Sequence, residues 1–340
     1  MAVAEMNPAP STGEQGGTMT AIVRARYGIG ELELREVDRP ALEDDQVLIR
    51  VHASSVNPVE WYGVTGPPLM RLLGGGLRRP KETAVGADLA GRVEAVGKDV
   101  VNYQPGDEVF GTSGASWAEY APAREARLAR KPANVSFEEA AATPIAAVTA
   151  LQALRDKGRV QPGQKVLING ASGGVGTYAV QLAKHLGADV TAVCSTANVE
   201  LARALGADRV VDYTVEDFTR LGERHDLMVD IAGSRSFREL SRVLTSDATV
   251  VIVGAKFPSS KLLGPLSHVI RTRLAALGKS QTVKFFIAKI NSEDLGYLGE
   301  LLEAGQLRSV IDRRFALSDA ADALRYLGEG HARGKVIITV

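Results

Sequence analysis

Residues 165–187 read KVLINGASGGVGTYAVQLAKHLG, and the fold of the chain is decided here. The apolar run at 166–168 predicts a buried strand, and apolar residues recur at helical spacing from Val175 to Leu186. Between the two, glycines stand at every third position, 170, 173 and 176. The stretch therefore predicts a strand, a tight turn and a helix.

Glycines with this spacing are typical of a turn that binds a dinucleotide. Only glycine lets the backbone turn sharply, approach a pyrophosphate and pack the helix onto the strand. The helix N-terminus adds free N–H groups and a partial positive charge for the phosphates. The residues that we expect at the phosphates are Gly170, Ser172, Gly173, Gly174, Val175 and Gly176.

Two other interpretations of the turn exist. Residues 170–174, GASGG, fit the G-x-S-x-G elbow of serine hydrolases, with Ser172 as nucleophile, and a glycine turn can also be purely structural. The continuation favours the dinucleotide, because further strands are predicted at 189–194, 209–211, 227–232 and 249–253, with helices between them. Such a βαβ series predicts an α/β fold with the doubly wound parallel sheet of Rossmann domains.

Composition excludes several classes of function. The chain has 340 residues, long enough for two domains, and its 40 basic residues balance 40 acidic ones. We therefore expect neither nucleic acid nor an anionic membrane as a partner. The single cysteine, Cys194, excludes an internal disulfide and suits a reducing compartment, so we predict a cytoplasmic protein. No apolar run approaches the eighteen residues of a membrane span.

The N-terminal part has a different pattern. Residues 1–18 are small, polar and free of Lys and Arg, which predicts a disordered extension and no targeting peptide. From Ala21 to about Arg130, short alternating segments separated by turn residues predict a small, curved β domain. A Gly-rich basic loop at 69–81 interrupts it.

Six stretches of the sequence carry a family resemblance. They are SSVNPVEWY (54–62), VGADLAGRVEAVG (85–97), PGDEVFG (105–111), AAATPIAAVTALQAL (140–154), NGASGGVGTYAVQLAKHLGADV (169–190) and GHARGKVIITV (330–340). In this order they resemble the medium-chain dehydrogenase/reductase superfamily, in its zinc-free quinone oxidoreductase-like branch. The resemblance implies a GroES-like catalytic domain at 19–145 and 291–340, and a Rossmann NAD(P)-binding domain at 146–290.

The resemblance also bears on zinc. The zinc enzymes of the superfamily take a Cys and a His from places that hold Asn57 and Ala87 here, and their lobe of four cysteines is missing. An amide and a methyl group cannot replace a thiolate and an imidazole around zinc. The five histidines are scattered, without a pair at metal-binding spacing. We therefore expect that the reaction proceeds without a metal ion.

The resemblance implies three residues beside the nicotinamide. Asn57 falls where the zinc-free branch keeps an asparagine at the nicotinamide and its ribose, and Tyr62 where a tyrosine faces the substrate and can donate to its oxygen. Thr149 aligns with a threonine on the nicotinamide side. The structural alternatives are a turn residue before Pro58 for Asn57, a packing aromatic for Tyr62 and a helix back-bond for Thr149.

The choice between NAD and NADP depends on the residues at the end of the second Rossmann strand, residues 189–194. An NAD enzyme places a carboxylate there, but this chain has Cys194-Ser195-Thr196. Ser195 and Asn198 can donate to a 2′-phosphate, and Tyr213 matches a tyrosine that the family uses at the adenosine phosphate. The Lys or Arg of many NADPH-using relatives is absent, yet NADPH is favoured over NADH. Lys335, in the last predicted strand, is a further candidate cofactor contact.

The C-terminal half suggests how the chain assembles. Leu266, Ile270 and Leu274 form an apolar stripe on a predicted helix within 261–281, which either packs on its own chain or walls a substrate pocket with the loop at 69–81. A strand predicted at 284–290 falls at the edge of the Rossmann sheet, where relatives pair across a two-fold axis. An uncovered edge strand invites pairing, so we expect a homodimer.

The function expected from all these features is a zinc-independent, NADPH-dependent oxidoreductase. It passes hydride from the nicotinamide to a quinone, an activated alkene or a carbonyl. The alternatives are an NADPH-binding protein without turnover and a serine hydrolase that uses Ser172.

Overall fold

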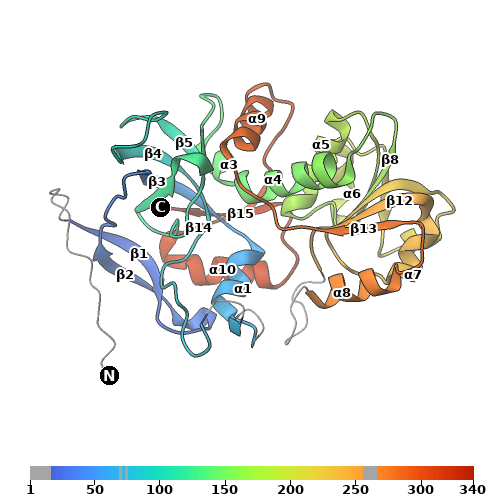
Figure 1. Ribbon diagram of the computed structural model, residues 1–340, viewed down its shortest axis with the longest axis horizontal. Helices are drawn as coiled ribbons and strands as arrows, with labels where there is room; N and C mark the ends of the chain where they lie inside the picture. The colour runs from blue at the N-terminus through green and yellow to red at the C-terminus, as the bar shows by residue number, and fades with distance from the viewer. Residues whose placement is uncertain (1–16, 69–70, 73–75, 256–265) are drawn as a thin grey trace.

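The computed structural model describes residues 17–68, 71–72, 76–255 and 266–340. Its described strands form a two-stranded, a six-stranded and a seven-stranded sheet. Figure 1 shows the β-rich part, with the C-terminus, on one side and the parallel sheet with its helices on the other. In the described ranges, no helix has the length and apolar character needed to cross a membrane.

The parallel sheet contains the glycine turn. Its strand order is β10-β9-β8-β11-β12-β13, so the chain reverses direction across the sheet between β8 and β11. The strands are β8 (Lys165–Asn169), β9 (Asp189–Cys194), β10 (Arg209–Asp212), β11 (His225–Asp230), β12 (Leu244–Ile252) and β13 (Thr282–Phe285). Ligands of such sheets bind outside the carboxyl ends of the strands at this switch point, which is where residues 170–173 follow β8.

Helices cover the two faces of this sheet. They are α5 (Gly174–His185), α6 (Val199–Ala204), α7 (Phe237–Leu240) and α8 (Leu266–Ala275), with α4 (Pro144–Gln152) packed against α5. The buried face of α5 includes Ala179 and Leu182, two of the predicted apolar positions. Between β10 and β11 the structure has only a 3₁₀ turn, Phe218–Arg220, where a helix was predicted. The carboxylate of Asp217 caps this turn, because it accepts hydrogen bonds from the amide and the hydroxyl of Thr219.

The second large sheet is built from both ends of the chain. Its order is β14-β15-β3-β4-β5-β7, with β6 also paired to β3. The strands are β3 (Gln46–Val56), β4 (Asp88–Val96), β5 (Glu108–Thr112), β6 (Tyr120–Arg124), β7 (Leu128–Arg130), β14 (Ile311–Ala316) and β15 (Lys335–Thr339). Strand β15 runs antiparallel to β3, with Val336 opposite Val56. The expected return of the C-terminal segment to the first domain is therefore present, although the exact domain boundaries stay a prediction.

The remaining elements join the two large sheets. The hairpin of β1 (Thr18–Arg24) and β2 (Leu32–Asp38) and the helices α1 (Pro58–Thr65), α3 (Phe137–Ala141) and α10 (Ala320–Gly328) accompany the seven-stranded sheet, and α9 (Ser292–Glu303) packs on both α4 and β7. Helix α4 is buried on nearly every side, as expected of an apolar helix between two layers. Tyr178 of α5 also shares a 2.7 Å hydrogen bond with Ser309, just before β14.

Two predicted boundaries need correction. Residues 1–16 of the expected N-terminal extension lie outside the described residues, but β1 already begins at Thr18, because this residue pairs with Asp38 in the hairpin. The edge strand predicted at 284–290 is β13, Thr282–Phe285. Pairing with β12 ends at Phe285, opposite Ile252, the last residue of that strand. Phe286 and Ile287 therefore lie outside the sheet.

Candidate functional site

The glycine turn has the geometry of a cradle. Gly170 has a φ of +94°, which side chains other than glycine rarely adopt, and a Cβ on Gly176 would lie 2.1 Å from the Gly170 oxygen. A Cβ on Gly173 would meet nothing nearer than the Gly170 oxygen at 3.8 Å. Gly170 and Gly176 are thus required by the fold itself. The position of Gly173 has space that the protein does not fill, which fits a dinucleotide pyrophosphate at this point.

The residue before the C-terminal strand contacts the glycine turn. The amide of Gly334 donates to the Ser172 carbonyl at 2.9 Å, and Gly334 forms an isolated parallel bridge with Gly173. A Cβ on Gly174 would lie 3.1 Å from Cδ of Lys335. The side chain of Lys335 therefore passes the first residue of α5, Gly174, and reaches toward Asn57.

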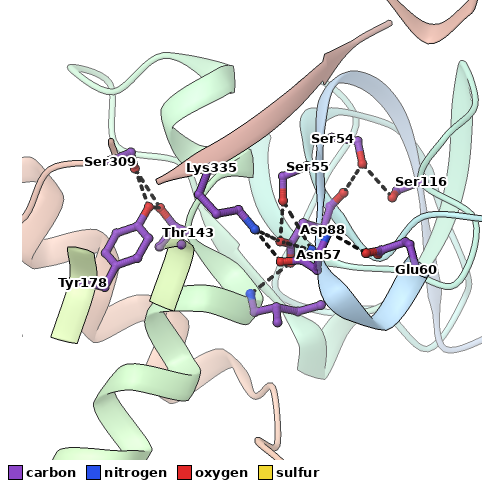
Figure 2. Close-up of polar contacts among 12 residues, drawn as sticks. Ser54, Ser55, Asn57, Glu60, Asp88, Ser116, Thr143, Tyr178, Ser309 and Lys335 are labelled. Atoms are coloured by element: carbon purple, nitrogen blue, oxygen red, sulfur yellow. Dashed lines mark hydrogen bonds and ion pairs between the residues drawn. The ribbon is translucent and has the colours of Figure 1, made fainter. Parts of the chain in front are cut away.

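Lys335 ends in a buried polar network around Asp88, shown in Figure 2. Its Nζ donates to Oδ1 of Asn57 and lies 3.4 Å from Oδ2 of Asp88. The same carboxylate oxygen accepts from Asn57 Nδ2 at 2.9 Å and from Ser55 Oγ at 2.6 Å, while Oδ1 accepts the Ile145 amide at 2.9 Å. Asp88 is 0% exposed and Lys335 2%. Because a buried charge needs partners, the network fixes all of these groups in place.

Chain pairing explains why these residues meet. The antiparallel pairing of β15 with β3 places Lys335 next to the end of β3, where Asn57 follows Val56. Asp88 begins β4, which pairs with β3 on its other side. Asn57 also precedes Pro58, the first residue of α1, so it is the turn residue of the structural interpretation as well as a member of the network.

Glu60 adds a second acid to this region. Its Oε2 accepts the Asn57 amide at 2.7 Å, whereas Oε1 is buried and has no hydrogen-bond partner among the described residues. Burial, followed by the nearby charge of Asp88, raises the pKa of Glu60 to about 8. With this pKa the carboxyl is mainly neutral at pH 7, two residues before Tyr62 on the same helix.

At the carboxyl end of β9, three of the predicted cofactor residues come together. Nδ2 of Asn198 donates to Oγ of Ser172 and to Oγ of Ser195, both at 3.1 Å. Within the described part of the chain, neither hydroxyl donates a hydrogen bond, and Oδ1 of Asn198 is buried without a partner. Two hydroxyl donors therefore remain for a ligand between the turn and β9, which fits the phosphate-rich adenosine end of a dinucleotide.

One acidic residue at this edge was missed by the sequence analysis. The carboxylate of Asp212, at the end of β10, accepts from Thr196 Oγ1 at 2.5 Å and from Thr214 Oγ1 at 2.7 Å. These hydrogen bonds, that of Thr196 first, lower the pKa of Asp212. No carboxylate follows β9 itself, as the sequence indicates, but β10 pairs in parallel with β9 and sets Asp212 opposite Cys194.

Among the described residues, no catalytic base is hydrogen-bonded to the Ser172 hydroxyl. Its hydroxyl accepts from an amide, Asn198 Nδ2, and not from an imidazole. A nucleophile elbow needs a base within hydrogen-bond reach of the hydroxyl. The geometry therefore gives no support to the hydrolase interpretation.

Comparison with known proteins identifies the family. Residues 43–135 match the family described as alcohol dehydrogenase GroES-like domain, and residues 205–338 match the family described as zinc-binding dehydrogenase. A chloroplast envelope quinone oxidoreductase homolog of Arabidopsis thaliana is 33% identical over 339 residues, 95% of this chain and 99% of the relative. The chain belongs to the medium-chain dehydrogenase/reductase superfamily, in its quinone oxidoreductase-like branch. It is an oxidoreductase with a nicotinamide cofactor.

Two further similarities agree with this assignment. The structure of the quinone oxidoreductase from Coxiella burnetii superimposes with a TM-score of 0.83 at 31% identity, covering 95% of this chain and 100% of that one. The NADPH-dependent alkenal/one oxidoreductase of Arabidopsis thaliana chloroplasts is 31% identical over 346 residues, 94% of this chain and 79% of the relative. The similarity covers both the GroES-like and the Rossmann parts.

The places of the superfamily's zinc ligands hold other chemistry here. Asn57 is tied by its amide to Asp88 and Lys335, and the Ala87 carbonyl accepts the amide of Ser113 at 2.8 Å. Across the described ranges, no three His, Cys, Asp or Glu residues are grouped so that they could hold a metal ion.

The other predicted site residues are placed as follows. Tyr62 is half-buried on α1, and Thr149 is half-buried on α4. Tyr213 is 53% exposed, and its amide donates to the Cys194 carbonyl at 3.0 Å, which keeps it near the adenosine end. Burial raises the pKa of Cys194 to about 11, which disfavours its thiolate form. None of these placements tests a catalytic role.

The expected packing of the α8 stripe on its own chain was wrong. Ile270 is 49% exposed and Leu274 62%, while α8 buries Val269 and Thr272 instead. The helix is rotated so that Val269 enters the core cluster around β11 and β12. Pro265 and most of the Gly-rich part of the loop at 69–81 lie outside the described residues, so the structure does not show whether they wall a substrate pocket.

Proposed function

We propose that this chain is a zinc-independent, NADPH-dependent reductase of quinones, activated alkenes or carbonyls. The observation that supports it most is the hydrogen bond from the Gly334 amide to the Ser172 carbonyl, because it places Lys335, and with it the buried polar network of the other domain, beside the open dinucleotide turn. The two named Arabidopsis relatives and the Coxiella structure act, by their names, on quinones or on alkenals and enones. This range of substrates is the one that we propose here.

The residues present fit the cofactor. The amides at the start of α5 and the open position of Gly173 would hold the pyrophosphate, and Ser172, Ser195 and Asn198 the adenosine end. When bound, the nicotinamide supplies the hydride that reduces the substrate. Lys335 and Asp88 orient Asn57, whose remaining Oδ1 lone pair is the group that we assign to the nicotinamide side.

Tyr62 is the proposed donor to the substrate oxygen. A phenol that hydrogen-bonds an oxygen as it gains charge stabilises the transition state more than the ground state. Its place on α1, one turn after Asn57, supports this assignment. Thr149 and Tyr213 are proposed as contacts at the nicotinamide and adenosine ends.

Preference for NADPH is also part of the proposal. The two serine hydroxyls that donate nothing within the described chain favour a 2′-phosphate, whereas the charge of Asp212 opposes it. Titrations with NADPH and NADH decide the preference, and Asp212→Asn should shift it further toward NADPH. Equal affinity of the unaltered protein for both cofactors would contradict the assignment of Ser195 and Asn198.

The deciding experiment follows NADPH absorbance with quinones, enones and aldehydes in the presence of a chelator. We expect turnover of at least one class with no loss to chelation, and no stoichiometric zinc by elemental analysis. Tight NADPH binding without oxidation by any substrate class would contradict the enzyme and favour a binding protein. One zinc per chain would contradict the metal-free chemistry.

We also propose a homodimer in the cytoplasm, without nucleic acid or membrane partners. Strand β13 ends the parallel sheet, and apolar side chains are exposed nearby, on α8 at Ile270 and Leu274 and after the strand at Ile287. Light scattering should give twice the chain mass, and Ile270→Glu with Leu274→Glu should lower it. A monomer at micromolar concentration would contradict the dimer. Cell fractionation tests the location, because the Arabidopsis relatives carry chloroplast names.

A further inference from the structure

A separate cavity lies beside the parallel sheet. It has a volume of about 600 Å³ and is bounded by α7, by α8 and by the loop after β11. Sites for small organic molecules measure about 300 to 1,000 Å³, so the cavity has the size of a ligand site. Neither the residues of the glycine turn nor those of the Asp88 network are part of its lining.

Arginine dominates the charge of this cavity. Its lining includes Arg235, Arg238 and Arg271, against one acid, Glu239. The carboxylate of Glu239 is held by the hydroxyl and the amide of Ser236, at 2.6 and 2.8 Å, at the start of α7. The cavity is therefore cationic.

Two of the three arginines form no ion pair with an acid of the described residues. Arg235 lies 3.7 Å from a carboxylate oxygen of Asp217. Arg238 and Arg271 are exposed, and neither forms an ion pair with any acid in the described part of the chain. Two guanidinium groups are thus available to an anion, and their planar donors match both carboxylate and phosphate oxygens.

His268 completes the polar lining. Its Nε2 lies 2.9 Å from Oδ2 of the fully buried Asp230, and only 13% of its side chain is exposed. Asp230 is held in turn by Asn169 Nδ2 at 2.8 Å and by the Gly233 amide at 3.0 Å. The imidazole is therefore fixed by a chain of buried groups, and Asn169 directly precedes the glycine turn.

We propose that this cavity binds a small organic anion, a phosphate ester or a carboxylic acid, through Arg238, Arg271 and His268. The apolar side of the lining, which includes Phe237 and Ala255, suits the carbon skeleton of such a ligand. The lining contains no residue of the glycine turn, and the proposal does not rest on the proposed hydride transfer. Through Asp230 and Asn169, its occupant lies one hydrogen-bonded chain away from the dinucleotide turn.

Calorimetric titration tests the proposal with two probes, inorganic pyrophosphate and succinate. The protein is first saturated with NADP⁺, so that the phosphate sites of the cofactor are filled. We expect at least one probe to bind, and Arg238→Ala with Arg271→Ala to weaken it about a hundredfold or more, because each lost charge-assisted hydrogen bond costs about tenfold or more. Arg273→Ala is the matched control, since this arginine lies on α8 but does not line the cavity.

The outcomes separate the possibilities. Preference for pyrophosphate assigns a phosphate ligand, and preference for succinate a carboxylate. The proposal is overturned if neither probe binds at about 20 mM, if the double variant binds as well as the unaltered chain, or if Arg273→Ala weakens binding equally. If NADP⁺ itself fails to bind, the proposed function is contradicted. The same titrations with the two probes, carried out on the chain without NADP⁺, then still test whether the cavity binds an anion.

Discussion

Replacement of Glu60 by glutamine should change how the stability of the protein depends on pH. The carboxyl has a pKa of about 8 in the folded chain against 4.5 when exposed. The folded state therefore keeps a proton that the unfolded state releases, and the resulting stability is complete below about pH 4.5 and is lost as the pH rises through about 8. Glutamine keeps the shape and the acceptor for the Asn57 amide but does not titrate.

The size of the effect follows from the shift. At 1.36 kcal/mol per pKa unit, the free energy of unfolding should fall by about 3 kcal/mol between about pH 5.5 and 8.5 because of Glu60 alone. Glu60→Gln should lack this fall, so the difference in unfolding free energy between the variant and the unaltered protein should grow in favour of the variant by that amount.

Urea unfolding at several pH values measures the difference. Fluorescence of the two tryptophans, one of which is Trp61, reports the transition. Glu239→Gln is the control, because it removes a capping carboxylate from α7 whose pKa is lowered, chiefly by the hydrogen bond from the Ser236 hydroxyl. Parallel pH profiles for Glu60→Gln and the unaltered protein would refute the reasoning, since they would mean that Glu60 is ionised in the folded chain at pH 7.

Three further predictions follow from the site. Gly173→Val should abolish NADPH binding in a titration while leaving the melting temperature nearly unchanged. Gly176→Ala should instead destabilise the fold, because its Cβ would lie 2.1 Å from a backbone oxygen. Loss of folding in both variants would contradict the open cradle. Tyr62→Phe should lower kcat for enones roughly ten- to a thousandfold, with NADPH affinity nearly unchanged. The loss should be smaller for quinones, because they can take their proton from water. Full activity on every substrate class would make Tyr62 a packing residue. Asn57→Ala should weaken both NADPH binding and turnover, because it empties the centre of the Asp88 network, and unchanged NADPH affinity would remove its cofactor role.

Much of the Rossmann part was predictable because its signals are local. The glycine spacing, the apolar run of β8 and the helical period of α5 lie within residues 165–187, and the predicted strand at 189–194 coincides with β9. Strand and helix periods are properties of neighbouring residues, so the sequence predicts them without knowledge of distant contacts. The order of the motifs along the chain predicted the family in the same way.

The sequence was less informative about which faces are buried. The stripe of α8 has the correct period, but Ile270 and Leu274 are exposed while Val269 and Thr272 are buried. A period says that a helix has an apolar side, and the rotation of the helix about its axis depends on what it packs against. Asp212 was missed for a related reason, since only the pairing of β10 with β9 brings it to Thr196.

The sequence by itself determined the dinucleotide turn, the two fold types and the absence of a Cys and a His at the two zinc positions of the superfamily. Only the tertiary structure decided that Asn57, Asp88 and Lys335 form one network, because they come together through the pairing of β3 with β4 and with β15. The same holds for the titration of Glu60. Its pKa depends on the exclusion of water by segments far apart in the chain, and no local pattern encodes that burial.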